Sequence, residues 1–526
     1  MVKRVRLVFA DKYFLVFLFI FIFSFILRIL AVLNCNFAFT MDQGRDMLDL
    51  RNIIVGKHLA LIGPTTSVNG VFLGPFWYYF NLIPNILGRG NPFYLVLWLI
   101  LWFQLAGLIL WLYLKKFGAL FALFASGLFL MSPALFSASS YSWNSNLAPV
   151  FSLFFFLSLF WFLERTGYKR AIILGLILGL CLQIQAAFGI LLLPFTLIIF
   201  SWKKVNFRLV LFLVSSFLLT LLPQLFFELR HNFLMTRTFV DEFFGTSAIL
   251  GEKLTLLQTI FNHLSNFNKV FDELTKMLFN LSSLIFLIGV LFLYLQTKRG
   301  DLPKKLKDYF LIPTGFLIFS FVCYLFYPHS LKFWFLFGFY IPLILIMALF
   351  LARLLQSTSK FLRFLVTILF LTFFVFVGYL QVKLIYGNLS GTLVDKSSFK
   401  NELAAVDWVY QMAGGKGFRV YNYIPSVYDY PYQYIFWWYG ESKYGYQPES
   451  VSYGRNVPQY ITNDVSYWQN RKSIEGNYQT FLITEKDNDF PQRLLNWRAG
   501  FNNLCSAGEK DFNWGTRVEI LENCPT

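Results

Sequence analysis

Long runs of apolar residues constrain this chain more than any other feature. The runs lie between residues 13 and 386, and each is about 15 to 25 residues long, the length of helix that crosses the ~30 Å hydrocarbon core of a bilayer. Charged residues make up only 14% of the chain, whereas soluble domains carry roughly 25%. From residue 387 onward the runs stop, and polar residues, Tyr and Trp replace them. The sequence therefore predicts a membrane part followed by a water-exposed part.

We expect a polytopic α-helical membrane protein with about eleven transmembrane helices in residues 1–386 and an α/β domain in residues 387–526. The division of residues 171–201 into two spans requires a tight turn near Gln185. The expected spans are 13–33, 93–114, 119–132, 147–163, 171–186, 188–201, 208–226, 278–296, 309–326, 338–355 and 362–385.

The Lys and Arg residues are divided unequally between the two sets of loops. One set is short, includes residues 1–12, and holds 20 Lys or Arg, whereas the much longer opposite set holds 10 before residue 387. Cytoplasmic loops carry such an excess, so we expect a cell membrane protein with a cytoplasmic N-terminus and an extracytoplasmic C-terminal domain. The net charge of +17 then reflects membrane topology, and we infer no nucleic-acid partner.

Two of the predicted outer loops are too long to serve only as connections. Loop 34–92 follows the first span, and loop 227–277 has the pattern of an amphipathic surface helix. Within the first loop, residues 42–51 have helical spacing, and residues 75–87 form an apolar stretch that is too short to cross a bilayer. We expect both stretches to lie along the membrane surface.

The first outer loop also carries the densest group of charged side chains. Carboxylates near the membrane plane are costly unless they are solvated or functional. A sugar transferase needs a carboxylate base for the acceptor hydroxyl and cations for the departing phosphate. The alternative is a solvated loop whose charges pair with one another, Arg45 with Asp46 or Asp49. The charged residues are Asp42, Arg45, Asp46, Asp49 and Arg51.

This arrangement resembles the GT-C superfamily of membrane glycosyltransferases, in the branch of protein O-mannosyltransferases and aminoarabinose transferases. The resemblance rests on the first span, on Asp42 just beyond it, and on the stretch Gly74 to Tyr79 before the second span. Members of that branch usually have Glu after the catalytic Asp, where this chain has Gln43, and His-Pro where it has Gly74-Pro75.

The resemblance implies an enzyme that uses a polyprenyl-phosphate sugar as donor at the outer face of the membrane, with a protein, lipid or glycan acceptor. It implies that Asp42 is the general base of an inverting transfer. It also implies a basic residue before the tenth span, which points to Lys332 as a phosphate ligand. Arg230 and Arg45 are further phosphate candidates, because guanidinium groups match phosphate oxygens. Lys332 could instead reach the headgroups without any ligand, and Arg230 could pair with Glu228.

Other polar side chains at the outer ends of the predicted spans are candidates for lining the substrate cavity. Amides can hold sugar hydroxyls, but they cannot act as bases. Each of these residues could equally cap a helix or bond between helices. The candidates are Asp46, Asn144, Asn146, Gln185 and His329.

The C-terminal part has its own signals. Residues 399–413 have helical spacing before Gly414-Gly415, and residues 418–423 and 480–484 are typical of strands. A disulfide between Cys505 and Cys524 is as plausible as two free thiols. No cluster has metal-ligand spacing, although a single Mg²⁺ or Mn²⁺ could bind Asp42 and Asp46.

Two further functions compete with sugar transfer from a lipid donor. A polymerase or ligase of surface polysaccharide would use similar chemistry. A transporter or flippase of lipid-linked sugars should show paired halves with broken helices at the bilayer midplane, and the sequence has no such pairing. A sensor or scaffold is a third alternative, which gives the acidic first loop no purpose.

Overall fold

The computed structural model describes residues 12–68, 70–244, 253–276, 282–391, 395–455 and 479–524. Their chain forms two compact units. The first unit comprises the described residues of Met1–Ile29, Ala60–Phe80 and Leu97–Lys383, and the second comprises Leu30–Leu59, Asn81–Val96 and the described residues of Leu384–Thr526. The basic residues before position 12 lie outside the described ranges, and the predicted domain boundary after residue 386 stays a prediction.

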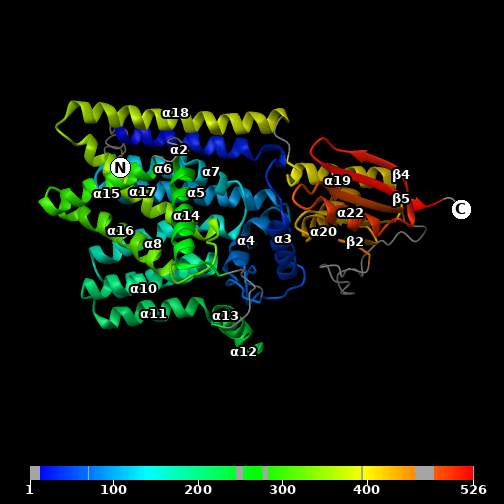
Figure 1. Cartoon of the computed structure of the whole chain (residues 1–526), viewed down its shortest axis with the longest axis horizontal. Helices are drawn as coiled ribbons and strands as arrows, with labels where there is room; N and C mark the ends of the chain where they lie inside the picture. Colours follow the sequence, from blue (N-terminus) through cyan, green and yellow to red (C-terminus); the bar gives the residue numbers. More distant parts are fainter. Residues whose placement is uncertain are drawn as a thin grey trace. The chain divides into compact units, whose positions relative to one another are not determined.

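The first unit is helical (Figure 1). The residues of α2, α4, α5 and α18 are divided between the two units. Short 3-10 helices, η2 (Lys115–Phe117), η3 (Asn144–Leu147) and η4 (Phe333–Phe339), join some of the longer ones. The α-helices are α2 (Lys12–Ala31), α4 (Phe76–Leu87), α5 (Phe93–Leu114), α6 (Ala119–Met131), α7 (Pro133–Ser139), α8 (Ala148–Glu164), α9 (Tyr168–Ile184), α10 (Ala186–Trp202), α11 (Phe207–Thr220), α12 (Leu222–Arg230), α13 (Leu234–Phe244), α14 (Leu256–Thr275), α15 (Ser282–Arg299), α16 (Lys304–Tyr324), α17 (Tyr340–Leu355) and α18 (Lys360–Ser390).

Each of the eleven predicted spans overlaps one of these helices, so the predicted polytopic helical class is confirmed. Among the described residues, seven helices are long and apolar enough to cross a membrane, or up to nine if each of two bent pairs counts as one span. The count of eleven exceeds this number partly because α9 and α10 have only 17 residues each. The predicted turn at Gln185 is confirmed, since its extended backbone separates these two helices.

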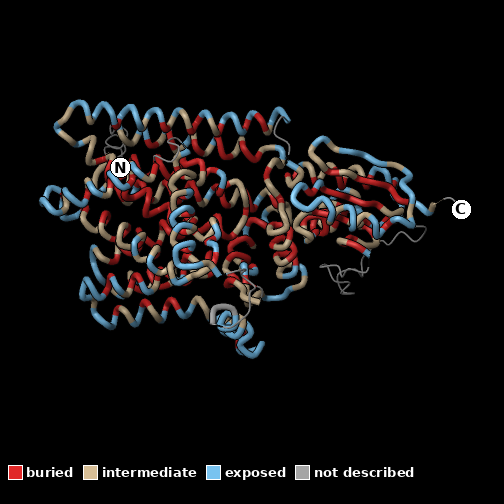
Figure 2. The backbone as a smooth tube through the Cα atoms, viewed as in Figure 1, coloured by how far each residue is buried: buried red, intermediate tan, exposed pale blue. Residues whose placement is uncertain are grey.

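Small residues let helices of the first unit approach closely. A methyl group at Gly175 would lie 2.2 Å from the Leu213 carbonyl oxygen, and one at Gly179 would lie 1.9 Å from the Thr220 hydroxyl oxygen. Backbones that approach in this way are typical of helices packed in membranes. Aromatic side chains pack α2 against α18, where the Phe23 and Phe374 rings are 5.8 Å apart. One side of α18 stays exposed along its length (Figure 2).

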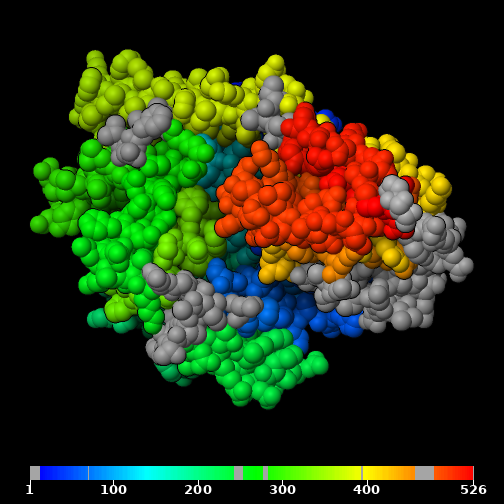
Figure 3. Space-filling view, turned by 45° about the vertical axis from the view of Figure 1, so that its right-hand side comes forward, coloured from blue at the N-terminus to red at the C-terminus, as the bar shows by residue number. Residues whose placement is uncertain are grey.

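The loop predicted as an amphipathic surface helix contains α12, α13 and α14 over its described part. Two polar contacts organise it: Glu228 at the end of α12 accepts the backbone N–H groups of Met235 and Thr236, at 2.8 and 3.0 Å. The first two helices leave apolar side chains exposed, and they project at the lower edge of Figure 3, in green. The exposed side chains are Leu222, Leu225, Phe226, Leu229, Phe233, Leu234, Phe239 and Val240.

The second unit is built around a five-stranded sheet with strand order β2-β1-β3-β5-β4. Strand β1 pairs in parallel with β2 and β3, whereas β5 pairs antiparallel with β3 and β4. The elements are η1 (Leu33–Cys35), α3 (Met41–Ile54), α19 (Phe399–Ala413), β1 (Phe418–Tyr423), α20 (Tyr430–Tyr439), the π-helical turn η5 (Gly440–Tyr444), β2 (Ser450–Ser452), β3 (Gln479–Glu485), α22 (Pro491–Ala499), β4 (Leu504–Asp511) and β5 (Thr516–Asn523).

The central strands of this sheet are buried on both faces (Figure 2). Leu482 of β3 packs with Phe501 and Leu521, whereas the neighbouring Phe481 ring lies 5.6 Å from the Phe418 ring. Neighbouring side chains of a strand point to opposite faces of the sheet. Leu482 and Phe481 therefore lie on opposite faces, and helices cover both of these faces. The predicted helix 399–413 and strands 418–423 and 480–484 are confirmed as α19, β1 and β3.

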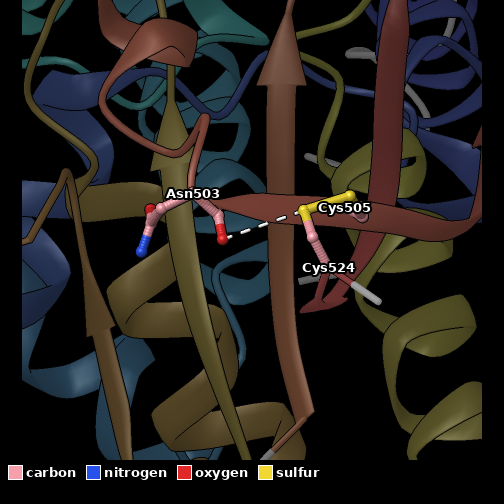
Figure 4. Close-up of a disulfide and its surroundings, with 3 residues drawn as sticks. All are labelled: Asn503, Cys505 and Cys524. Carbon is pink, nitrogen blue, oxygen red and sulfur yellow. Dashed lines mark hydrogen bonds between the residues drawn. A yellow bond between two sulfur atoms is a disulfide. The ribbon is translucent and has the colours of Figure 1, made fainter. Parts of the chain in front are cut away.

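Two of the cysteines, Cys505 and Cys524, form a disulfide in the sheet unit. Cys505 of β4 bonds to Cys524, directly after β5, with Cα atoms 4.9 Å apart (Figure 4). The Cys524 sulfur lies 3.9 Å from the Asn503 carbonyl oxygen. Because β4 and β5 are neighbours in the sheet, the disulfide ties the last strand to the edge strand. The structure thus decides a pairing that the sequence leaves open.

Candidate functional site

Helix α3 carries the acidic cluster of the first outer loop, and its first turn explains the glutamine at position 43. Gln43 Oε1 accepts the Thr40 backbone N–H at 2.9 Å and the Thr40 hydroxyl at 2.8 Å. Glu or Gln at this third helical position can serve as such a cap. Gln43 therefore starts the helix, and it places the following carboxylates without adding a charge of its own. The expected helix along residues 42–51 is confirmed.

One arginine joins two carboxylates on α3. Arg45 Nη1 lies 2.9 Å from Asp42 Oδ1, and Arg45 Nη2 lies 2.9 Å from Asp46 Oδ1. The two carboxylates differ in access: the Asp42 side chain is 22% exposed and that of Asp46 only 3%. A buried charge must be paired, so Asp46 anchors Arg45, and Arg45 in turn orients the accessible carboxylate of Asp42.

These contacts match the interpretation that the loop charges pair with one another, with Asp42 as an additional partner of Arg45. They do not remove the chemical capacity of Asp42. Its carboxylate lies in the first turn of a helix, where the backbone dipole favours negative charge, and one face of it meets solvent. A carboxylate with these properties can accept a proton from a bound hydroxyl group.

The described part of the chain contains no group of three or more His, Cys, Asp or Glu side chains placed to hold a metal ion. The sequence suggests that a Mg²⁺ or Mn²⁺ ion could bind Asp42 and Asp46. In the structure, the guanidinium group of Arg45 supplies the positive charge between these two carboxylates.

The first unit contains an apolar cavity of about 310 Å³. Its walls come from residues 66–68 and Val71 of one loop, the start of α10, the end of α16, Phe335 of η4 and Phe239 of α13. The loop wall is a tight hairpin: Leu73 N–H donates to the Pro64 carbonyl at 2.9 Å, and Thr66 N–H to the Val71 carbonyl at 2.9 Å. The cavity lining is thus mostly apolar, with a few polar groups near it.

Gln185 is the sequence-predicted residue that the structure places in this cavity. Its amide nitrogen donates to the Ser145 hydroxyl at 2.9 Å and to the Trp334 carbonyl at 3.2 Å. Gly189 makes the sharp turn possible, since a methyl group there would lie 2.4 Å from the Leu182 Cα. These two hydrogen bonds hold η3 and η4 together at the cavity wall that contains Gln185.

The other two predicted amides have structural partners outside the set of cavity-lining residues. Asn144 donates to the Ile184 carbonyl at 2.8 Å, and Asn146 to the Tyr141 carbonyl at 2.7 Å. Both side chains are buried. These bonds fit the alternative in which the polar segment caps helix ends, while a role toward a sugar stays a prediction.

The predicted cations of the first unit differ in their surroundings from Arg45. Lys332 is exposed and stands directly before η4, the 3-10 helix that contributes Phe335 to the cavity. Arg230 is exposed in the last turn of α12, and the Glu228 carboxylate next to it caps α13. His329 is buried, and its carbonyl oxygen lies 3.3 Å from His263 Nε2. Lys332 and Arg230 therefore keep exposed charges that could meet an anion.

Several lining residues give no signal in the sequence. Tyr324, Tyr327, Thr66 and Ser67 supply further polar groups near the cavity, and Tyr324 donates to the Ala187 carbonyl at 3.0 Å. An aromatic residue at the end of an apolar run is common at membrane interfaces, so sequence alone does not mark these tyrosines. Phe72, whose carbonyl accepts Gln224 at 3.4 Å, ties the hairpin to α12.

The second unit buries further carboxyl groups that sequence analysis missed. Glu402 of α19 and Glu485 of β3 are both buried, and the Tyr432 hydroxyl donates to Glu485 at 3.2 Å. Burial raises the pKa of Glu485 to about 7 and that of Glu402 well above its usual range. Burial also raises the pKa of Asp429 to about 6. Burial thus favours the protonated form of all three carboxyl groups, and the packing around them is that of the interior of the sheet unit.

No protein-family model matches this chain, and no curated protein is significantly similar to it in sequence. Solved structures do match. The crystal structure of ArnT from Cupriavidus metallidurans bound to undecaprenyl phosphate is 11% identical, covers 97% of this chain and 98% of that chain, and has a TM-score of 0.57. The apo state of the same protein, also 11% identical, covers 94% and 96% with a TM-score of 0.54.

The oligosaccharyltransferase of Archaeoglobus fulgidus, tethered to an acceptor peptide, is 13% identical over 98% of this chain and 74% of that chain, with a TM-score of 0.48. The likeness to ArnT extends over both units, including the sheet. At this identity it shows a shared fold. The resemblance expected from the sequence is therefore confirmed at the level of fold: a polytopic membrane protein with an ArnT-like arrangement and a C-terminal mixed β-sheet.

Proposed function

We propose that this chain is a membrane glycosyltransferase that moves a sugar from a polyprenyl-phosphate donor to a hydroxyl group of a protein, lipid or glycan acceptor. The observation that carries the proposal is the near full-length likeness in fold to ArnT, whose crystal structure holds undecaprenyl phosphate. A donor with a hydrocarbon tail explains why the enzyme has many apolar helices. The Lys and Arg asymmetry of the loops supports transfer at the outer face of the membrane.

Asp42 is the proposed general base. The acceptor oxygen forms a bond to the anomeric carbon of the sugar while the bond from that carbon to the phosphate oxygen breaks. The acceptor proton passes to Asp42, and polyprenyl phosphate leaves with the bonding electrons. One displacement of this kind inverts the anomeric carbon. Support comes from the partly exposed carboxylate of Asp42 and from its contact with Arg45.

The departing phosphate needs positive charge nearby. Lys332 and Arg230 are proposed for this role because their side chains are exposed. Arg45 is a third proposed cation, which would share its guanidinium between the phosphate and the two carboxylates it holds. Arg45 would then have two tasks, to bind the phosphate and to hold the two carboxylates. The structure describes its contacts with the carboxylates.

The apolar cavity of the first unit is proposed to take the first isoprene units of the donor. Its lining is mostly aliphatic and aromatic, and Gln185, Thr66, Ser67 and two tyrosines are among the polar exceptions. Burial of a hydrocarbon chain contributes about 0.8 kcal/mol per CH₂ group, so a few isoprene units give substantial binding. Lys332 stands directly before η4, three residues before Phe335 of the lining.

The test uses the full-length protein in detergent with a panel of radiolabelled polyprenyl-phosphate sugars and a membrane extract as acceptor source. Label should leave the lipid with wild-type protein, and Asp42→Asn should abolish this loss while donor binding is retained. Asp407→Asn is the matched control, because Asp407 is also an ion-paired carboxylate of the second unit, bonded to Lys443 at 2.9 Å.

Equal turnover by wild type and Asp42→Asn would remove Asp42 from the mechanism and leave the enzyme assignment standing. Donor binding without any loss of label, together with movement of the intact donor across vesicle membranes, would favour the flippase alternative instead.

A further inference from the structure

The backbone directly before α3 pairs with the C-terminal part of the second unit. Phe39 N–H donates to the Ser397 carbonyl at 2.7 Å, and Phe399 N–H donates to the Phe37 carbonyl at 2.9 Å. The Phe37 and Phe399 rings stack with centroids 5.3 Å apart. The entry to α3 is therefore fixed by the residues at which α19 begins.

Farther along, α3 packs against α20 (Figure 1), and Gly44 lies close to the backbone at the start of α20. A methyl group at Gly44 would lie 2.4 Å from the Pro431 backbone nitrogen and 2.6 Å from the Tyr430 carbonyl carbon. These atoms are backbone, so they cannot turn aside. Glycine inside a helix lowers helix stability by about 1 kcal/mol relative to alanine. Position 44 nevertheless has glycine because the backbone of α20 lies too close for a side chain.

One more contact holds the same side of α3. The guanidinium carbon of Arg51 lies 4.6 Å from the centre of the Trp437 ring, and Arg51 is buried. Positions seven residues apart lie on one side of a helix, so Gly44 and Arg51 both face α20. A guanidinium over an aromatic face is attracted by the ring, more strongly when water is excluded.

The opposite side of the helix carries Asp42. Residues two positions apart are rotated by about 200° around a helix axis of 3.6 residues per turn. This rotation agrees with exposure, because Gly44 is buried against α20 whereas Asp42 is partly exposed. The contacts with α20 thus leave the carboxylate accessible while they fix the position of the helix that carries it.

We propose that Gly44 and Trp437 are positioning residues: through α20, the C-terminal sheet domain sets the place of Asp42 during sugar transfer. This inference rests on the proposed function. Misplacement of a reacting group by about 1 Å can cost 100-fold in rate, and a loosened α3 would misplace Asp42 without changing any group that binds the donor tail. The expected signature is a fall in kcat that exceeds the rise in the KM for donor, because α3 carries Asp42 and Arg45 but none of the residues that line the cavity proposed for the donor tail.

The experiment compares full-length variants in detergent by steady-state transfer and by hydrogen exchange of the α3 amides. Trp437→Ala should lower kcat about 10- to 100-fold and speed exchange in α3, whereas Trp437→Phe, which keeps a ring under Arg51, should recover most of the rate. Gly44→Ala should lower kcat similarly, since its methyl group must push α3 away from Pro431.

Two matched controls separate positioning from general damage. Gly508→Ala makes the same change in β4, where the new methyl group would lie an ordinary 3.5 Å from Ile520. Trp497→Ala removes a tryptophan that packs on Phe501 of the sheet core. Gly508→Ala should leave both readouts unchanged, and Trp497→Ala should lower domain stability with kcat within about 3-fold of wild type once the folded fraction is corrected for.

Three results would overturn the inference. One is a wild-type kcat for Trp437→Ala despite faster exchange in α3. Another is an equal loss of kcat in Trp437→Ala and Trp497→Ala. The third is unchanged exchange in α3 in both Trp437→Ala and Gly44→Ala. Failure of the proposed function looks different: the wild type would consume no donor, while exchange in α3 would still respond to Trp437→Ala.

Discussion

The two units bury different kinds of polar groups. In the helical unit the buried polar side chains are mainly amides and hydroxyls that bond to backbone carbonyls, as Asn144 and Asn146 do. Its buried Arg28 likewise donates to the Ser139 hydroxyl at 2.9 Å and the Leu130 carbonyl at 2.8 Å. In the sheet unit the buried polar side chains include carboxylates such as Asp46, Glu402 and Glu485.

This difference shows where acid–base chemistry is available. A neutral amide in an apolar helical bundle fixes geometry and cannot accept a proton from a substrate. Among the buried carboxylates that the structure describes, Glu228 alone belongs to the helical unit, and it caps α13. In the proposed function, the apolar ligand is therefore assigned to the helical unit and the base to α3 of the sheet unit.

The largest expected effect concerns the charges on α3. Arg45→Met leaves Asp46, whose side chain is 3% exposed, without its cation. Removal of one partner of a buried ion pair costs about 3–5 kcal/mol, so we expect a markedly lower unfolding temperature in detergent and faster hydrogen exchange in α3.

The double variant Arg45→Met with Asp46→Leu is the control for this prediction. It removes the buried charge together with its partner, and it should recover most of the stability. If the double variant were no more stable than Arg45→Met, the contrast between the buried carboxylates of the sheet unit and the buried amides and hydroxyls of the helical unit would lose its energetic basis.

The next effect is the pH dependence of the sheet unit. Burial raises the pKa of Glu485 from 4.5 to about 7, so the folded unit binds a proton that the unfolded chain has lost between these values. The contribution to stability is complete below pH 4.5 and disappears as pH rises through 7. The two values imply a loss of about 3 kcal/mol, and burial of Glu402 acts in the same direction.

Chemical denaturation between pH 5 and pH 8, followed by tryptophan fluorescence, checks this prediction. Glu485→Gln should flatten the profile, because an amide does not titrate. Glu509→Gln is the matched control, since Glu509 is a half-exposed carboxylate of β4 paired with Arg517. A steep profile that survives in Glu485→Gln would assign the pH dependence to another group.

A smaller effect is expected from an amide of the helical unit. Gln183 accepts the Phe76 backbone N–H at 3.1 Å and donates to the Thr220 carbonyl at 2.6 Å. Gln183→Leu leaves both backbone groups without these partners, which costs about 1–3 kcal/mol. The unfolding temperature in detergent should fall at every pH alike, in contrast to the sheet unit. A pH-dependent loss would break the comparison.

The smallest expected effect concerns donor affinity. Lys332→Gln removes an exposed charge near η4, and a lost phosphate contact should weaken donor binding about 10-fold, or ~1.4 kcal/mol. Binding of a fluorescent polyprenyl phosphate measures it, with Lys298→Gln at the end of α15 as the control. Equal affinities for wild type and Lys332→Gln would remove Lys332 from the proposed phosphate ligands.

Much of this fold was predictable from the sequence because membrane helices give long apolar runs. The break at Gln185 was also predictable, since residues 171–201 are too long for one span and charges flank them. The bend between α6 and α7 was not predicted from the sequence, although Pro133, the first residue of α7, lies next to it. Strand β4 escaped prediction because it lies at the sheet edge and exposes most of its residues, which removes the alternation of apolar side chains. Strand β5 lacks the alternation for the opposite reason, since its neighbouring residues are buried on both faces.

The candidate site was predictable in its local part only. The charges of residues 42–51 lie on one helix, so spacing alone brings Asp42, Arg45 and Asp46 together. The cavity joins residues that are far apart in the chain, such as Val68, Ile190 and Phe335, and sequence patterns do not encode such contacts. The close approach of Gly44 to Pro431 is equally long-range. The one local signal for it is a glycine inside a helical pattern.

The most direct test of the account is the anomeric configuration of the product. The wild-type protein would be incubated with a polyprenyl-phosphate sugar of known anomeric configuration, and the transferred sugar would be examined by proton NMR. A single displacement with Asp42 as base predicts an inverted linkage. A retained linkage would contradict the account, because it requires two displacements and a covalent or ion-paired intermediate that Asp42 as general base does not supply.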